Sequence, residues 1–239
     1  EHGGAVYVDS RGARHAFTDP AVKLVIPPMG DMGSAALAAA CRRVGIRAEA
    51  LPRGTAEVLR IGRGATSCKE CLPMTICVGA LLDYLERRPP HAAGEKLMIL
   101  IPKAAGYCRL GQYHVTTSQY IRDHRIPDVA ILDLGMEEQF AGLGARFTYH
   151  AWKAIVATDV LDDIGCALRA LAVDREAAMR IFDAGCAAVI DAVEHASGRA
   201  FIARLASTAR ALARTEEHTT ELQSPNTNSY SLFFMKKKT

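Results

Sequence analysis

The sequence lacks several features that would point to a function at once. No apolar run approaches the roughly 20 residues of a membrane-spanning helix, and no secretory signal opens the chain. Basic residues (29 Lys and Arg) nearly balance acidic ones (26 Asp and Glu), so charge gives no argument for a nucleic-acid or other polyanionic ligand. The motifs of zinc peptidases (HExxH), serine hydrolases (GxSxG) and lysine-bearing phosphate loops are missing too. We therefore expect a cytoplasmic protein that binds neither nucleic acid nor membrane.

The chain does contain enough apolar material for a core, because hydrophobic residues make up 49% of its 239 residues. That length suits one α/β domain or two small domains. The 7 cysteines are an odd number, and their spacing does not suit a disulfide framework. Reduced thiols or metal ligands in a reducing compartment are the better interpretation.

Both ends of the chain differ from its middle. The chain begins at Glu1 without Met and enters a strand-like run almost at once, which indicates a piece of a longer protein, with residues 1–22 left from a preceding region. Composition changes after Arg214, where the run EEHTTELQS resembles a translated sequencing adapter. We interpret residues 215–239 as an artefactual, disordered tail that takes no part in fold or function.

In the first part of the chain, runs of apolar residues that end at turn-forming residues alternate with segments in which apolar residues repeat with the period of a helix. The continuous run KLMILI is typical of a strand that is covered on both faces, whereas apolar residues repeating every 3.6 positions predict a helix. The expected strands are residues 23–29, 46–51, 96–101 and 128–134, and the expected helices are residues 34–44, 73–87 and 111–124.

This alternation predicts an α/β fold for residues 23–146. Its form is a Rossmann-like, mostly parallel sheet of about four strands with helices on both sides. The pattern changes in residues 147–214, where no strand is visible and three long amphipathic helices are expected. We predict that this helical section follows the sheet as a separate C-terminal part.

Two loops that carry cysteine are the candidates for chemistry. The first contains Cys68 and Cys71 directly before a predicted helix, and the second contains Cys108 after the most apolar strand. In an open parallel sheet, sites form where strands end and helices begin. The positive end of a helix also stabilises a thiolate, the form that binds iron or zinc or attacks an electrophile.

Spacing alone leaves the role of these thiols open. The pair Cys68 and Cys71 fits half of a zinc site, a redox dithiol or part of a cluster, and no second close pair is present. Beside the loop thiols, Lys69, Glu70, Arg109 and Gln112 either balance charge, contact a substrate or are solvated surface residues. The other four cysteines lie at apolar helical positions and are predicted to be packing residues: Cys41, Cys77, Cys166 and Cys186.

The two loops belong to a longer series of motifs. TSCKECLP (66–73), GALL (79–82) and IPKAAGYCRLGQY (101–113) follow one another, with IPPMGD (26–31) before them and AWK (151–153) after. This series resembles the signature of the acyl-CoA dehydratase activase-related proteins, relatives of the 2-hydroxyacyl-CoA (2-hydroxyglutaryl-CoA) dehydratases. The chain departs from that signature at Cys68 and Ala80, where the family usually has Gly and Asp, and at Tyr107 and Leu110, where it has Pro and Phe.

The resemblance implies a 4Fe-4S cluster held by Cys71 and Cys108, the two thiols that match the family's own. The resemblance makes Cys68 an extra thiol. It would bind a metal only in addition to Cys71 and Cys108. Further ligands would come from a neighbouring domain or subunit. Such a cluster receives single electrons from an ATP-dependent activator and passes them to an acyl-CoA thioester. The actin-like ATPase part of these systems is absent from the chain, so no ATP site is expected in it.

Three hypotheses remain at this point. The first is an iron–sulfur component of an ATP-dependent acyl-CoA dehydratase or reductase system, which handles low-potential electron transfer to a CoA thioester. The second is a non-catalytic domain that docks an activator onto a dehydratase. The third is a zinc-binding structural module that uses Cys68, Cys71 and Cys108.

Overall fold

The computed structural model describes residues 6–9, 11–67, 69–87, 95–103, 106–134 and 143–220. The chain divides into two compact units, Glu1–Thr158 with Val193–His195 and Asp159–Ala192 with Ala196–Thr239. Each unit is described by itself below.

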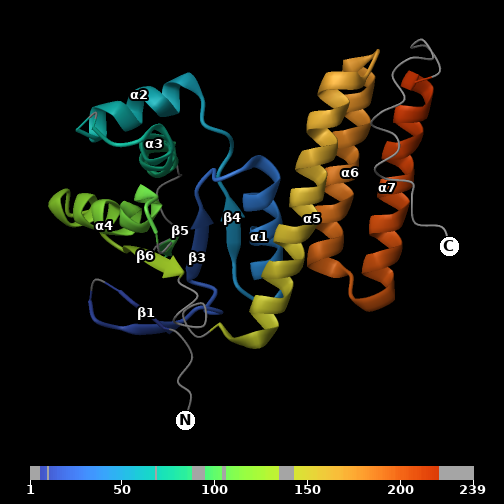
Figure 1. Ribbon diagram of the computed structural model, residues 1–239. Helices are drawn as coiled ribbons and strands as arrows, with labels where there is room; N and C mark the ends of the chain where they lie inside the picture. Colours follow the sequence, from blue (N-terminus) through green and yellow to red (C-terminus); the bar gives the residue numbers. More distant parts are fainter. Residues whose placement is uncertain are drawn as a thin grey trace. The chain divides into compact units, whose positions relative to one another are not determined.

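The first unit is built on a four-stranded sheet (Figure 1). Its strands are β3 (Val22–Ile26), β4 (Ala48–Ala50), β5 (Lys96–Pro102) and β6 (Val129–Leu134). They pair in the order β4-β3-β5-β6, and every pairing is parallel. The predicted α/β class and parallel sheet are therefore confirmed.

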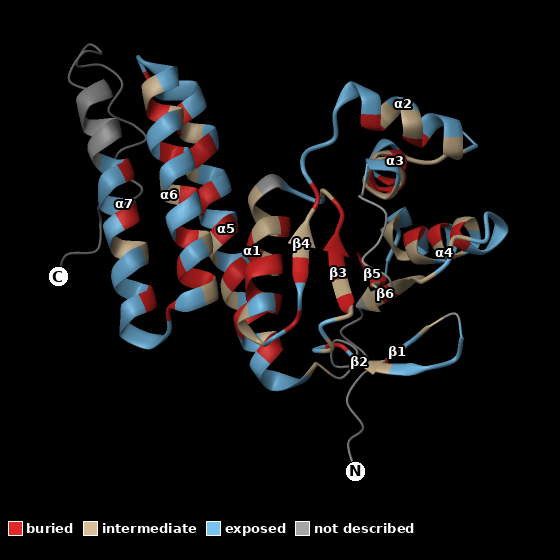
Figure 2. Cartoon of the chain, turned by 180° about the vertical axis from the view of Figure 1, so that it is seen from behind, coloured by how far each residue is buried: buried red, intermediate tan, exposed pale blue. Residues whose placement is uncertain are grey.

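Helices cover both faces of this sheet, as the buried run in β5 predicts. Leu24 and Leu100 point to one face, which is covered by α1 (Asp31–Arg43) and the start of α5 (Gly144–Leu171). The neighbouring strand residues point to the other face, which is covered by α3 (Leu72–Arg87) and α4 (Tyr113–Asp123). Figure 2 shows the buried residues concentrated in the strands and on the sheet-facing sides of the helices.

Helix α2 (Ala56–Ala65) packs against α3, and the sequence pattern does not predict it. The two helices approach so closely that a Cβ at Gly62 would overlap the carbonyl oxygen of Thr75. A Cβ at Gly79 would likewise overlap the carbonyl oxygen of Val58. Glycine permits this crossing, although it lowers helix propensity. The signals that predict α2 are its amphipathic pattern and the Thr55 cap, whose hydroxyl accepts from the Val58 N–H at 3.2 Å.

An antiparallel hairpin of β1 (Val6–Val8) and β2 (Arg14–Ala16) precedes the sheet. The sequence predicts a short strand at β1 but not at β2. Tyr7 and Phe17 are 4% and 7% exposed and belong to the core on the α1 side of the sheet. The segment interpreted from sequence as a remnant thus contributes two aromatic side chains to the core of the first unit.

The second unit is helical in its described residues. It contains the second half of α5, most of α6 (Arg175–His195) and α7 (Gly198–Thr220). Three long helices are present as predicted, but α5 is not amphipathic, and α7 extends past Arg214 to Thr220. Residues 221–239 lie outside the described part. No helix among the described residues has the length and apolar character that crossing a membrane requires.

One prediction about the cysteines is wrong. Cys41, Cys77 and Cys186 are buried as expected, but Cys166 is exposed. Cys166 lies in α5, where apolar and polar residues are distributed around the helix with little preference for one side. Apolar neighbours in the sequence therefore do not reveal which side of this helix faces solvent.

Candidate functional site: two cysteine loops

The carboxyl ends of β3 and β5 form the topological switch point of the sheet. From β3 the chain passes through α1 to β4 on one side, and it later returns to place β5 on the other side. Loops that diverge at such a point leave a crevice in which α/β proteins bind ligands. The loop after β3 is held by Ser34, whose buried hydroxyl accepts from the Met29 N–H at 3.1 Å and donates to the Pro27 carbonyl at 2.9 Å.

The first cysteine loop joins α2 to α3 and folds around the carboxylate of Glu70. This carboxylate accepts hydrogen bonds from the Ser67 N–H at 3.2 Å, the Ser67 hydroxyl at 2.9 Å and the Lys69 N–H at 3.1 Å. Backbone N–H groups and the Ser67 hydroxyl lower the pKa of Glu70. Glu70 therefore shapes the loop. Cys68 lies outside the described residues.

Cys71 ends this loop and caps α3, because its carbonyl oxygen accepts from the Thr75 N–H at 3.2 Å. Its Sγ lies 2.7 Å from the hydroxyl of Tyr113, the first residue of α4. The hydrogen bond from Tyr113 is the largest of the causes that lower the pKa of Cys71, followed by backbone N–H groups, Met74 first, and the charge of Arg109. The arrangement favours the thiolate form of a partly exposed sulfur.

Cys108 lies in the second loop, directly before the short 3₁₀ helix η1 (Arg109–Gln112) that leads into α4. Its thiol is exposed. Arg109 joins the two loops, since its guanidinium donates to the Lys69 carbonyl at 3.1 Å. Burial raises the pKa of Tyr113, and the hydrogen bond with Cys71 raises it further. The two cysteine loops, about 40 residues apart in sequence, are thus joined by the contact of Arg109 with Lys69 and by that of Tyr113 with Cys71.

The remaining predicted residues lie at the rim of this site. Lys69 is exposed. Gln112 is exposed as well, and its backbone carbonyl accepts from the Thr116 hydroxyl at 3.3 Å. The described residues contain no cluster of three or more His, Cys, Asp or Glu side chains with the geometry of a metal site. They join the two cysteine loops through the hydrogen bond of Arg109 to Lys69, and the thiols of Cys71 and Cys108 would supply two ligands of a four-ligand set.

Tyr113 is the residue that sequence reasoning missed. It ends the motif GQY, but the sequence pattern assigns no role to the tyrosine. Its position at the start of a predicted helix, five residues after Cys108, is the available signal, because first-turn side chains lie close to the preceding loop.

The buried thiols differ from Cys71, whose pKa is lowered. Burial raises the pKa of Cys41 to about 12 and that of Cys77 to about 11.

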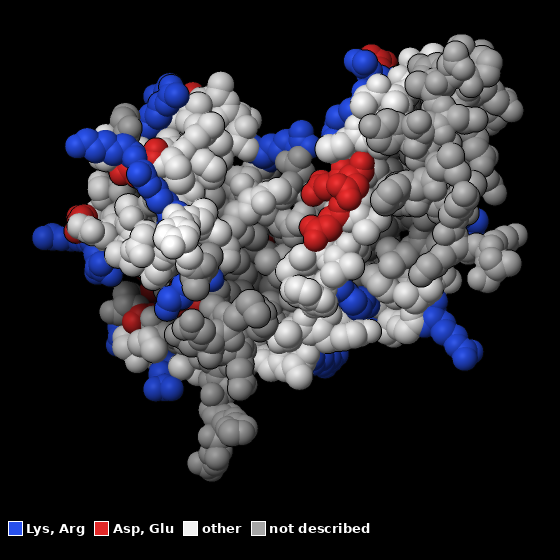
Figure 3. Space-filling model, in the orientation of Figure 1, with Lys and Arg blue, Asp and Glu red and all other residues white. Residues whose placement is uncertain are grey.

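Comparison with known proteins identifies no relative of this chain. No family model, curated protein or solved structure matches the chain. On the face shown in Figure 3, the basic side chains lie dispersed over the described surface, and the acidic ones form one patch over α5 with a few elsewhere. The two cysteine loops are therefore the chain's candidate site.

Proposed function

We propose that this chain is an iron–sulfur cluster-binding component of an ATP-dependent acyl-CoA dehydratase or reductase system. Cys71 and Cys108 are the proposed ligands of a 4Fe-4S cluster. The observation that carries the proposal is the meeting of two cysteine loops at the carboxyl edge of a parallel sheet, fixed by the contact between Arg109 and Lys69. The resemblance of both loops to the activase-related signature supports the same assignment.

The residues present fit such a group in kind. Iron–sulfur clusters are held by cysteine thiolates, and the surroundings of Cys71 lower its pKa. The cluster would supply one-electron transfer. Tyr113 would donate a hydrogen bond to the Cys71 sulfur, and the guanidinium of Arg109 would offset negative charge at that thiolate. The ligands beyond the two described thiols would be Cys68 or residues of another domain or subunit.

The proposed substrate is an acyl-CoA thioester, and the proposed partner is an ATP-dependent activator that delivers electrons. The side chains of Lys69 and Gln112 at the rim are the candidates for contact with either of them. A cytoplasmic location follows from the proposed chemistry, because free thiols persist in a reducing compartment.

The test is to purify the chain without oxygen, reconstitute it with iron and sulfide, and record its visible spectrum with the iron, sulfide and zinc content per chain. We expect a brown protein, with most of the colour and iron lost in Cys71→Ser and in Cys108→Ser. Cys166→Ser is the matched control, because that thiol is exposed but belongs to the second unit; it should keep the full cluster content.

Two results would contradict the proposal. A colourless protein that holds zinc, and loses it in the same two variants, would favour the zinc-binding structural module. Iron content that does not change in Cys71→Ser or Cys108→Ser would show that these thiols are not ligands, and would leave a docking domain as the better assignment.

A further inference from the structure

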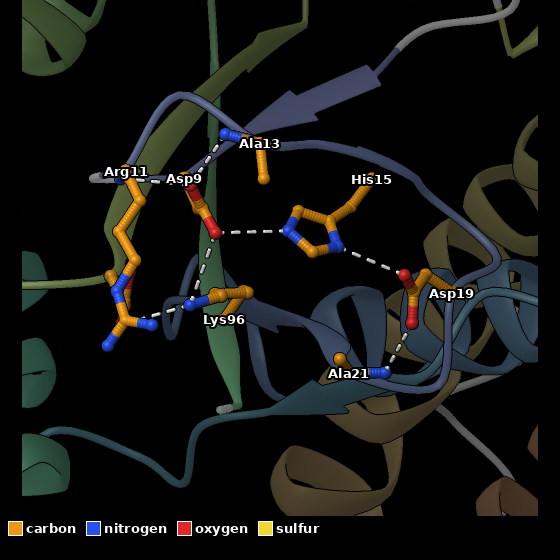
Figure 4. Close-up of polar contacts among 8 residues, drawn as sticks. Asp9, Arg11, Ala13, His15, Asp19, Ala21 and Lys96 are labelled. Carbon is orange, nitrogen blue, oxygen red and sulfur yellow. Dashed lines mark hydrogen bonds and ion pairs between the residues drawn. The ribbon is translucent and has the colours of Figure 1, made fainter. Parts of the chain in front are cut away.

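A histidine between two carboxylates holds the hairpin at the opposite edge of the sheet (Figure 4). Nε2 of His15 lies 3.1 Å from Oδ2 of Asp9, and Nδ1 lies 3.0 Å from Oδ2 of Asp19. Both ring nitrogens therefore face a carboxylate oxygen.

This arrangement specifies the protonation state of the ring. Ionised carboxylates only accept hydrogen bonds, whereas a neutral imidazole carries one N–H and a lone pair on its other nitrogen. Only the imidazolium form of His15 donates to both partners at once. In the neutral form, one carboxylate oxygen faces a nitrogen lone pair, and the contact becomes repulsive.

The two carboxylates are fixed by the backbone and cannot easily turn away. Oδ1 of Asp9 accepts from the N–H groups of Arg11 and Ala13, both at 2.9 Å. Oδ1 of Asp19 accepts from the Ala21 N–H at 2.8 Å. The second oxygen of each carboxylate is therefore held toward the histidine ring.

Other charged groups around the ring connect it to the sheet. Lys96, the first residue of β5, places Nζ 3.5 Å from Oδ2 of Asp9 and 3.1 Å from Oδ2 of Asp128. The ring of Tyr7 meets that of His15 edge-on, with centroids 6.2 Å apart. At the outer side of the same turn, Arg47 donates to the Pro20 carbonyl and pairs with Glu95, both at 2.7 Å.

Together, these contacts favour the protonated, positively charged form of His15. Hydrogen bonds to Asp19 and Asp9 raise the pKa of His15, and the bond from His15 lowers the pKa of Asp9. The ring proton joins Lys96 in offsetting the carboxylates of Asp9, Asp19 and Asp128. Its loss weakens the contact of β2 with the turn before β3, and it weakens the contact of His15 with Asp9, the hairpin residue that pairs with Lys96 of β5.

We propose that the β1–β2 hairpin is a proton-dependent clasp, which is docked on the amino ends of β5 and β6 while His15 is an imidazolium and loosens when His15 loses its proton. Loosening frees Tyr7 and Phe17 from the core of the first unit. This inference does not depend on the function proposed for the cysteine loops.

The sign of the pH dependence follows from linkage. The folded pKa of His15 is raised, so its contribution to stability is fully present below the pKa of an unfolded histidine, about 6.5. That contribution is lost as the pH rises through the higher pKa in the folded protein. The hairpin should therefore loosen on the alkaline side, while the sheet stays folded.

Hydrogen–deuterium exchange of the full chain, read by mass spectrometry over a pH series, tests the clasp. After correction for the intrinsic pH dependence of amide exchange, protection of residues 6–17 should fall at alkaline pH, while that of residues 96–102 should not. His15→Gln, which carries no titrating proton, should lack this step and show low hairpin protection throughout. His124→Gln, which replaces an exposed histidine at the end of α4, should keep the step.

Asp19→Asn provides a second variant that retains the histidine. Removing one of the two anionic partners should lower the pKa of His15, so the step should move to lower pH. An unmoved step in Asp19→Asn, or the same protection profile in His15→Gln and the unmodified chain, would overturn the proposal. NMR titration that placed the pKa of His15 at or below about 6.5 would overturn it as well.

Discussion

The two edges of the sheet in the first unit are built on different principles. At the amino edge, charged groups are enclosed and paired: the side chains of Lys96 and Asp9 are 8% and 6% exposed, and His15 bridges two carboxylates. At the carboxyl edge, Cys108 is exposed, Cys71 is partly exposed, and Tyr107 next to Cys108 is fully exposed. One edge completes its polar interactions within the chain, and the other leaves reactive groups open to a ligand.

This difference separates stability from function in the same fold. Buried charges that lose a partner are costly, so the amino edge should respond to substitution mainly through folding. The open thiols contribute little packing, so the carboxyl edge should respond mainly through binding and reactivity. Three experiments follow, of which the second and third compare the two edges directly.

The largest effect is expected from Gly79→Ala, where α2 crosses α3. The added Cβ would overlap the Val58 carbonyl, so the helices must separate at a cost of about 3 kcal/mol of unfolding free energy. Gly64→Ala is the control on α2, because a Cβ there meets nothing within 4 Å; it should be neutral or stabilising. Urea unfolding measures both, and equal effects would show that the close crossing does not matter.

A smaller effect is expected from lysines at the two ends of β5. Lys96→Met leaves Asp9 and Asp128 without their buried cation, whereas Lys103→Met removes a 3.8 Å contact with Asp133 between half-exposed groups. Lys103→Met should lower the unfolding free energy by about 0.5 kcal/mol or less, and Lys96→Met by several times as much. Thermal or urea unfolding compares the pair. A reversed order would remove the distinction between the edges.

The smallest effect on folding is expected from Tyr113→Phe, with a clear effect on chemistry. The hydroxyl is the largest cause of the lowered pKa of Cys71, so its removal should raise that pKa and slow alkylation of Cys71 by iodoacetamide several-fold near neutral pH in the metal-free chain.

Peptide mapping by mass spectrometry follows each thiol separately in that experiment. Alkylation of Cys166, an exposed thiol far along the chain, serves as the internal reference and should not change. Tyr120→Phe, a second tyrosine of α4, should leave Cys71 as reactive as before. An unchanged rate at Cys71 in Tyr113→Phe would mean that the hydroxyl does not stabilise the thiolate.

The parallel sheet could be predicted because its signal is local. The run KLMILI identifies a strand buried on both faces, and alternation with helical periods implies parallel pairing. Helix α2 was missed although its amphipathic pattern and the Thr55 cap are visible in the sequence, because Gly62 and Gly64 lower its propensity and drew attention away from both signals. The second strand of the hairpin was missed because Arg14–Ala16 contains no β-branched residue and no Tyr, Phe or Trp, whereas the equally short Val6–Val8 consists of such residues.

The sequence pointed to the cysteines of the candidate site, but not to the residues that contact the two cysteine loops. Cysteines before helices are visible in the sequence, but the choice of Cys71 and Cys108 among them came from the resemblance and stays a prediction. The contacts of Tyr113 with Cys71 and of Arg109 with Lys69 bridge about 40 residues of sequence. Pairings over such a distance depend on how the helices pack, which a single sequence does not reveal. The same holds for the cluster around His15, where Asp9 also pairs with Lys96 of β5.

The close packing of α2 against α3 at their glycines also affects how the first cysteine loop would bind a ligand. The backbones of α2 and α3 are in close contact, so the two ends of the short segment from Thr66 to Cys71 are held at a fixed separation. Within this segment, the carboxylate of Glu70 accepts hydrogen bonds from the backbone N–H groups of Ser67 and Lys69. A ligand that enters such a segment finds much of the ordering entropy already lost during folding. Affinity at this edge should therefore depend on how rigidly α2 and α3 are held against each other.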